Sequence, residues 1–154
     1  MKTFFIVLGF SLLLAACNSA RKMTGNTQIK QGIMGYIKER SGNQMPSPDI
    51  PEQEGKPMKT TVYVYENTHL SQVRRKGTSA FYDTLLTKFI TSAASDENGR
   101  FMIELPVGNY SLFTKMNGLF YANSFDSKNN VAPVNVLEDK ITEVNITVSA
   151  TASY

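Results

Sequence analysis

Apolar and polar residues alternate with a period of two over most of the chain between residues 32 and 149. Such alternation turns one side of an extended strand toward a core and the other toward solvent. Patterns with the helical period are weak. The clearest runs centre on the apolar residues Ile33, Gly35 and Ile37, then Val62 and Val64, then Phe101, Ile103 and Leu105, and last Val144, Ile146 and Val148. The pattern predicts short, half-buried β-strands.

Turn signals separate these runs. Asn98-Gly99 and Asn117-Gly118 each stand between two predicted strands. Because both residues of an Asn-Gly pair tolerate the positive φ angles of a type I′ turn, we expect a hairpin at each. Pro106 to Asn109 forms a third turn between two further strands. With a strand at 131–136 the count reaches seven to eight, which predicts an all-β antiparallel sandwich.

Two regions interrupt the regular pattern. Residues 42–57 hold four of the six prolines and cannot pair as a central strand. Residues 67–84 are polar around Gly77, and a short helix is an option at 80–87. Long loops carry function more often than the elements they join, so we expect specificity to lie in 42–57 and 67–84.

The N-terminus has the order of an export signal. Lys2 supplies a positive charge, residues 4–16 are uncharged and mostly apolar, and Leu14-Ala15-Ala16-Cys17 ends the segment. The apolar run is short for a membrane span and suits a signal peptide. The ending resembles the lipobox of bacterial lipoproteins, which implies removal of residues 1–16 and lipidation of Cys17 by two or three acyl chains, palmitate among them. There are two alternatives to lipidation: Cys17 is an ordinary residue of a signal peptide, or it is a buried thiol in a core helix.

The mature chain then divides into three parts. Residues 17–31 are the lipidated cysteine and a polar tether, residues 32–149 are the sandwich domain, and residues 150–154 are a C-terminal tail. Since Cys17 is the sole cysteine, the fold must stand without a disulfide.

Charge argues against nucleic acid as a partner. Loss of Lys2 with the signal leaves 15 basic against 13 acidic residues, without a basic stripe. One basic cluster, Arg74-Arg75-Lys76, lies in a polar stretch. It reads either as a solvated loop or as a patch for phosphate or anionic lipid.

A central motif resembles a known domain family. Ser95 to Phe101 and Leu105 to Tyr110 are similar to the "D-x-x-G-x-F … L-P-x-G-x-Y" core of carboxypeptidase regulatory-like domains, and the strands at 32–37 and 61–68 resemble that family's first two strands. The resemblance implies a transthyretin-like (prealbumin-like) Greek-key fold of the carbohydrate-binding-like type. Together with the signal, it is similar to stand-alone lipoproteins of Bacteroidota-type bacteria. Without a peptidase domain it implies no peptidase activity.

Folding accounts for every residue of this motif. We expect the Asp96 carboxylate to accept hydrogen bonds from backbone N–H groups, and Gly99 to take a left-handed conformation. Phe101 and Tyr110 should point inward from adjacent strands as packing partners. Pro106 and Gly108 shape the reverse turn.

The chain offers little for catalysis or metal binding, so we predict a protein that is not an enzyme and has no cofactor. His69 is the single histidine, whereas metal sites usually combine several His or Cys residues. No serine lies in a G-x-S-x-G context. Asp96–Asn98 and Asp126–Asn130 look like weak calcium loops but lack EF-hand spacing, so turn formation is the favoured explanation for both.

Tyrosines are the remaining candidates for a binding surface. Tyr36, Tyr63 and Tyr65 fall on the polar phase of their strands, and one of the consecutive pair Phe120-Tyr121 should also face outward, Tyr121 being our choice. Such rings stack on sugars or receive a protein partner. Alternatively, they favour strand formation and pack beneath the long loops. The absence of Trp weakens a sugar-binding interpretation.

These observations predict a lipid-anchored, non-catalytic β-sandwich of the cell envelope that binds or scaffolds an envelope protein. The alternative is a module for carbohydrate or another small ligand. Position 18 is Asn, where Asp resembles an inner-membrane retention signal, so we expect the outer membrane. Without an acidic cluster after Cys17 we expect the periplasmic side.

Overall fold

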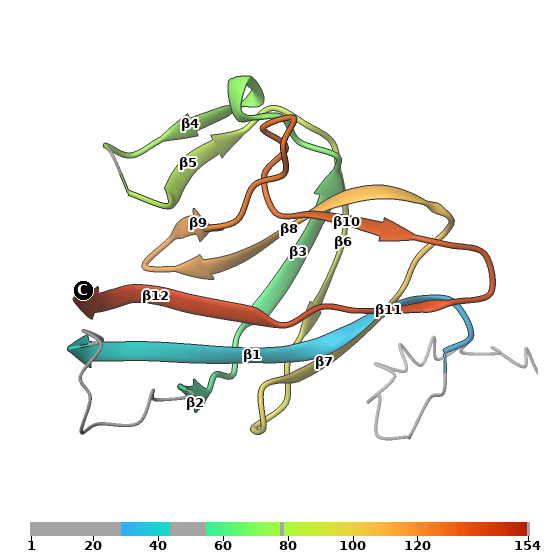
Figure 1. The fold of residues 1–154 in the computed structure, drawn as a ribbon, viewed down its shortest axis with the longest axis horizontal. Coiled ribbons are helices and arrows are strands. Elements are labelled where there is room, and N and C mark those ends of the chain that lie inside the picture. Colours follow the sequence, from blue (N-terminus) through green and yellow to red (C-terminus); the bar gives the residue numbers. More distant parts are fainter. Residues whose placement is uncertain (1–28, 44–54, 78, 154) are drawn as a thin grey trace, which may run out of the picture.

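The computed structural model describes residues 29–43, 55–77 and 79–153, with side chains omitted at 43 and 150–153. The predicted signal 1–16, Cys17 and most of the tether lie outside this range. Two sheets face each other (Figure 1). Their elements are β1 (Gly32–Asn43), β2 (Lys56–Pro57), β3 (Thr61–Glu66), the 3₁₀ helix η1 (Leu70–Gln72), β4 (Val73–Arg75), β5 (Phe81–Leu85), β6 (Phe89–Ala94), β7 (Arg100–Glu104), β8 (Gly108–Met116), β9 (Leu119–Tyr121), β10 (Pro133–Val136), β11 (Ile141–Glu143) and β12 (Ile146–Ser153).

The first sheet has five strands arranged around β1. β7 and β2 pair with β1 antiparallel, and β11 and β12 pair with it in parallel. In Figure 1, β11 and β12 run along one side of β1, while β7 and β2 run along the other. β1 is therefore hydrogen-bonded along both edges.

The second sheet has seven strands in the order β4-β5-β9-β8-β3-β6, with β10 also paired to β8. All its pairings are antiparallel. β8 is its longest strand and pairs with β3, β9 and β10 in turn.

The main core fills the space between the two sheets. β1 contributes Ile33 and Ile37, both fully buried, and β3 contributes Val62 and Val64 from the opposite sheet. A second core lies on the other face of the seven-stranded sheet. It consists of Tyr82, Phe113, Ala122 and Val131, with Leu70, Val73 and Leu85 packed against them.

The structure confirms the predicted all-β sandwich. It differs in detail, because the described residues hold twelve strands rather than seven or eight, and β1 has parallel as well as antiparallel neighbours. The predicted strand around Val144 is split between β11 and β12. Between them the Val144 N–H donates to the Met34 carbonyl oxygen at 2.8 Å, and the register is the same on both sides of the break, with Met34 opposite Glu143 and Ile37 opposite Ile146.

Of the two Asn-Gly turns, one forms the predicted hairpin. Asn117 and Gly118 have φ angles of 49° and 80° and join β8 to β9. The hairpin prediction at Asn98-Gly99 is wrong, because β6 and β7 belong to different sheets. After this turn the chain pairs with β1, and the Ile37 N–H donates to the Gly99 carbonyl oxygen at 2.8 Å.

The region 67–84 is more regular than its composition predicts. It contains η1, β4 and the start of β5, and the helix considered at 80–87 is wrong. Phe81 and Tyr82 account for a strand at this position rather than a helix, because Phe81 packs against the main core and Tyr82 lies in the second core. Successive side chains of a strand point to opposite faces of the sheet, so Phe81 and Tyr82 can each enter a different core. Successive side chains of a helix do not point in opposite directions. Of the region 42–57, residues 44–54 lie outside the described range. The prediction that this region does not pair as a central strand is wrong for Gly42 and Asn43, which end β1 and pair with β12, whereas Pro57 lies in the short strand β2.

The sandwich domain extends beyond both of the boundaries predicted at residues 32 and 149. The Gln31 side chain, assigned to the tether, donates from Nε2 to the Leu105 carbonyl oxygen at 2.8 Å and accepts from the Asp139 N–H at 3.0 Å. At the other end β12 continues to Ser153, so 150–153 is strand rather than tail. No helix in the described ranges is long and apolar enough to cross a membrane.

Gly99 and Gly118 offer a matched test of the sheet-to-sheet turn. Both have left-handed φ angles, 75° and 80°. A Cβ at Gly99 would lie 2.3 Å from the Ile37 carbonyl oxygen, whereas one at Gly118 meets nothing within 4 Å. We expect Gly118→Ala to cost about 1 kcal/mol of unfolding free energy from strain alone, and Gly99→Ala more than about 3 kcal/mol because β1 must also move. Denaturant melts measure both, and equal losses would contradict this account.

A second pair tests buried hydroxyls. Thr114 Oγ1 is buried and has no hydrogen-bond partner among the described residues. Thr68 Oγ1 donates to the Glu66 carbonyl oxygen and lies 2.7 Å from Thr87 Oγ1. We expect Thr114→Val to leave stability unchanged or raise it by up to about 1 kcal/mol, and Thr68→Val to lower it by about 1–3 kcal/mol. Chemical denaturation distinguishes the two, and a destabilised Thr114→Val would show that its hydroxyl is satisfied.

Candidate functional site

The motif residues hold the two sheets in place. Asp96 Oδ1 accepts from the Asn98 N–H at 2.9 Å and the Arg100 N–H at 2.8 Å, as predicted. The Tyr110 hydroxyl donates to the Pro106 carbonyl oxygen at 3.1 Å, the arrangement called a tyrosine corner. Each of these bonds fixes a turn.

The expected pairing of Phe101 with Tyr110 on adjacent strands is wrong. Phe101 is on β7 of the first sheet and Tyr110 on β8 of the second. The Pro106–Gly108 turn therefore crosses between sheets, and both rings meet in the main core from opposite sides.

The loop at Asp126 repeats the turn at Asp96. Asp126 Oδ1 accepts from the Lys128 and Asn130 N–H groups, and Oδ2 accepts from Asn130 Nδ2 at 2.8 Å. These hydrogen bonds, that to the Asn130 side chain first, lower the pKa of Asp126. The carboxylate is thus engaged in turn formation. The described part of the chain contains no cluster of three or more His, Cys, Asp or Glu suited to a metal ion.

His69 caps η1. Its Nδ1 accepts from the Ser71 N–H at 3.1 Å, and its own N–H donates to Gln72 Oε1 at 2.9 Å. This reciprocal pair is a capping box, which gives the histidine a structural role.

Two residues of the basic cluster at 74–76 form hydrogen bonds within the domain. Arg74 Nε lies 2.7 Å from Asp83 Oδ1 across the β4–β5 pair, and this hydrogen bond lowers the pKa of Asp83. Arg75 donates to the Ser79 carbonyl oxygen at the end of the same pair. These contacts favour a structural role over a phosphate patch.

Tyr121 is the tyrosine for which our expectation of exposure is wrong. It is 3% exposed, and its hydroxyl accepts from the Ser149 N–H at 3.0 Å. β9 pairs with β5 in the register Phe81 with Tyr121, so both rings face the main core. Phe120 therefore points to the other face.

Tyr63 and Tyr65 lie at the edge of the second core. Both are half-buried, and the Tyr65 ring meets Phe113 and Phe120 edge-to-face with centroids 5.7 Å apart. Burial raises the pKa of Tyr65. Lys115 Nζ lies 5.4 Å from the Tyr63 ring centroid and 4.8 Å from that of Phe120. These tyrosines thus pack against aromatic rings of β6, β8 and β9.

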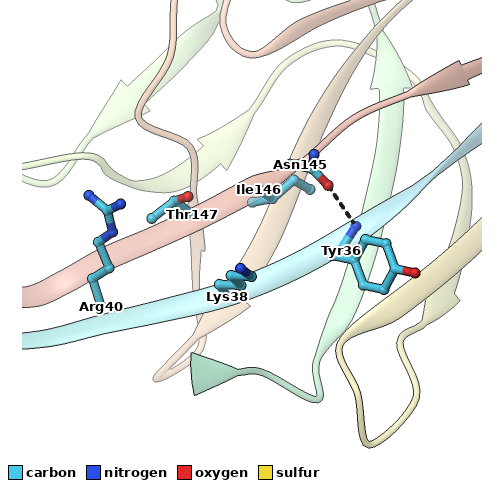
Figure 2. A pocket seen from close by; sticks show the side chains of 6 residues that line it. All are labelled: Tyr36, Lys38, Arg40, Asn145, Ile146 and Thr147. Carbon is cyan, nitrogen blue, oxygen red and sulfur yellow. Dashed lines mark hydrogen bonds between the residues drawn. The ribbon is translucent and has the colours of Figure 1, made fainter. Parts of the chain in front are cut away.

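Tyr36 lies on the opposite sheet, so the four tyrosines do not form one surface. It is 42% exposed and lines a depression of about 300 Å³ on the first sheet. Figure 2 shows that its side chains come from β1, from the start of β12 and from Asn145, the residue before β12. The lining residues are Tyr36, Lys38, Arg40, Asn145, Ile146 and Thr147.

Strand alternation and parallel pairing build this depression. Tyr36, Lys38 and Arg40 are two residues apart on β1, and Lys38 pairs with Thr147 of β12. The Tyr36 N–H donates to Asn145 Oδ1 at 3.2 Å, which holds the Asn145 side chain against the backbone of Tyr36 (Figure 2). Arg100 of β7 pairs with Tyr36 on its other side. The result is a row of guanidinium, ammonium and aromatic side chains on β1, with hydroxyl and amide groups on the neighbouring segment, and its cations suit a carboxylate-bearing ligand.

Sequence reasoning found Tyr36 but missed the rest of this depression. The polar phase of β1 was a usable signal for Lys38 and Arg40. Asn145 and Thr147 carry no such signal, because they join the site only through the parallel pairing of β1 with β12.

Comparison with known proteins returned no matching family model, no matching curated protein and no matching solved structure. The site must therefore be interpreted from its own geometry.

Asp126 predicts how the stability of the fold responds to acid. Because its pKa is lowered in the fold, the carboxylate stabilises the protein above its unfolded pKa near 4, and this contribution is lost as pH falls through the lower folded value. We expect Asp126→Asn to be less stable than the wild type at pH 7, with the difference vanishing at strongly acidic pH. Thermal melts across pH measure it, with Glu138→Gln as the charge-matched control. A stability difference between Asp126→Asn and the wild type that does not change with pH would show that ionisation of Asp126 does not contribute to stability.

Proposed function

We propose that this protein is a lipid-anchored, non-catalytic binding module of the cell envelope, with the depression around Tyr36 as its binding site. Its partner would be an acidic segment of another envelope protein. The observation that carries the proposal is the convergence of Tyr36, Lys38 and Arg40 with Asn145 and Thr147 in one depression.

The chemistry of the depression supports an anionic partner. Lys38 and Arg40 bring two positive charges to one row of β1, and Arg100 stands across from Tyr36 on β7. Charge-assisted hydrogen bonds from such groups to carboxylates are stronger than those between neutral groups. The Tyr36 ring adds apolar contact area at one end of this row (Figure 2), and tyrosine is enriched among the residues that dominate interface energies.

The N-terminal sequence supports the proposed location. The order of charge, apolar segment, small residues and Cys17 favours lipidation at Cys17. Asn18 favours delivery to the outer membrane, and the neighbouring residues favour its periplasmic side. As a lipoprotein domain with a carboxypeptidase regulatory-like motif, the protein would hold its partner near the membrane.

One observation favours a carbohydrate as the second candidate ligand. The depression combines the exposed Tyr36 ring with the Asn145 amide and the Thr147 hydroxyl, and sugar sites combine a stacking ring with amide and hydroxyl groups.

Charge reversal tests the proposed partner. We expect in-cell crosslinking of the Lys38→Glu/Arg40→Glu double variant to capture at least about tenfold less partner protein than the wild type, since two attractive contacts become repulsive. The matched control is Lys88→Glu/Lys128→Glu, which reverses two exposed charges outside the depression. Mass spectrometry of captured proteins and expression levels provide the readout.

Two results would oppose the proposal. Equal capture by both double variants would exclude the depression as the protein-binding site. Binding on a glycan array that is lost in Tyr36→Ala, with protein capture unaffected, would favour the carbohydrate alternative.

A further inference from the structure

The end of the sandwich where β1 begins carries three exposed apolar side chains. Val107 is 57% exposed, Leu137 is 49% exposed and Ile141 is 38% exposed. Val107 lies in the turn between β7 and β8, while Leu137 and Ile141 bracket the turn between β10 and β11. Exposed turn tips are usually polar, so three large apolar side chains on two turns call for a partner.

Strand register brings the two turns together. Gly108 pairs with Val136, so Val107 and Leu137 are the next residues outward on the same two strands. Ile141 pairs with Gly32 at the start of β1. In Figure 1 the β7–β8 and β10–β11 connections and the start of β1 all lie at the right-hand end.

Gln31 joins this end directly to the incoming chain. Its Nε2 donates to the Leu105 carbonyl oxygen before the first turn, and its Oε1 accepts from the Asp139 N–H in the second. The two apolar turns are thus held on either side of the point where the domain begins.

Chain length limits what can cover this end. Only residues 18–28 separate Cys17 from Ile29, and such a segment reaches at most about 40 Å when fully extended. A domain tethered so closely meets the bilayer first with the end at which the tether enters.

We propose that Val107, Leu137 and Ile141 dock this end of the sandwich on the lipid bilayer, an inference that rests on the proposed lipidation of Cys17. Apolar side chains of this size gain free energy when they enter the boundary between headgroups and acyl chains. Hydrogen bonds from the Asp139 N–H to Gln31 and from the Gly32 N–H to the Lys140 carbonyl oxygen join the segments that carry Lys30, Glu138, Asp139 and Lys140, so these four charges offset each other. Docking is therefore driven by the apolar side chains and depends little on anionic lipid.

A single tryptophan makes this contact measurable, because the chain contains none. The lipidated full-length Leu137→Trp variant would be reconstituted into phosphatidylcholine–phosphatidylethanolamine vesicles that contain lipids brominated on their acyl chains. The control is Leu86→Trp, which labels an apolar residue 73% exposed in the β5–β6 connection beside η1. We expect the Leu137→Trp fluorescence to be quenched at least about twofold and the Leu86→Trp fluorescence to be nearly unchanged. Adding Val107→Glu to Leu137→Trp should reduce the quenching.

Each remaining outcome overturns a defined part of the proposal. Equal quenching of the two tryptophans, or none in either while the protein floats with the vesicles, refutes docking and leaves the anchor intact. A wild-type protein that neither floats nor takes up labelled fatty acid, and so behaves like Cys17→Ser, refutes the proposed anchor together with the docking that rests on it.

Discussion

Hydrogen bonding of β1 along both edges is the constraint on which the rest of the structure depends. Its partners come from distant parts of the chain, with β7 and β2 on one side and β11 and β12 on the other. This fixes the strand's orientation. Ile33 and Ile37 then enter the main core, while Tyr36, Lys38 and Arg40 line the outer depression. Alternation along one strand thus supplies both the centre of the core and the centre of the candidate site.

The two outer faces of the sandwich are used differently. The outer face of the seven-stranded sheet is covered by the chain's own segments, since Tyr82 and Phe113 lie in a second core beneath Leu70, Val73 and Leu85. The rings of Tyr63 and Tyr65 complete that core and are poorly placed to receive a ligand. The outer face of the five-stranded sheet carries Tyr36 and the cationic side chains near it. This division is the reason for assigning binding to the five-stranded sheet.

Sequence predicted the elements better than their partners. Alternation is local, so the strands around Ile33, Val62 and Phe101 were identified correctly. The two Asn-Gly turns look alike in sequence, but only one of them joins two paired strands. The turn reverses the chain direction, whereas the residues that follow it determine which strand they pair with. Beyond Gly118 the chain returns to β8, and beyond Gly99 it pairs with β1 of the other sheet. Tyr121 and the Asn145 side of the depression were missed for the same reason, since both depend on strand pairings that no local pattern encodes.

Gln31 and the central position of β1 also determine how the domain would respond to force. A pull on the N-terminal chain is delivered along the axis of β1, whose hydrogen bonds to β7 and β11 lie across that axis. Such bonds are loaded together in shear, whereas a strand pulled from a sheet edge loses its bonds one at a time. If the domain is anchored through Cys17 as proposed, it would therefore keep its fold, and with it the depression around Tyr36, while its attachment is under tension.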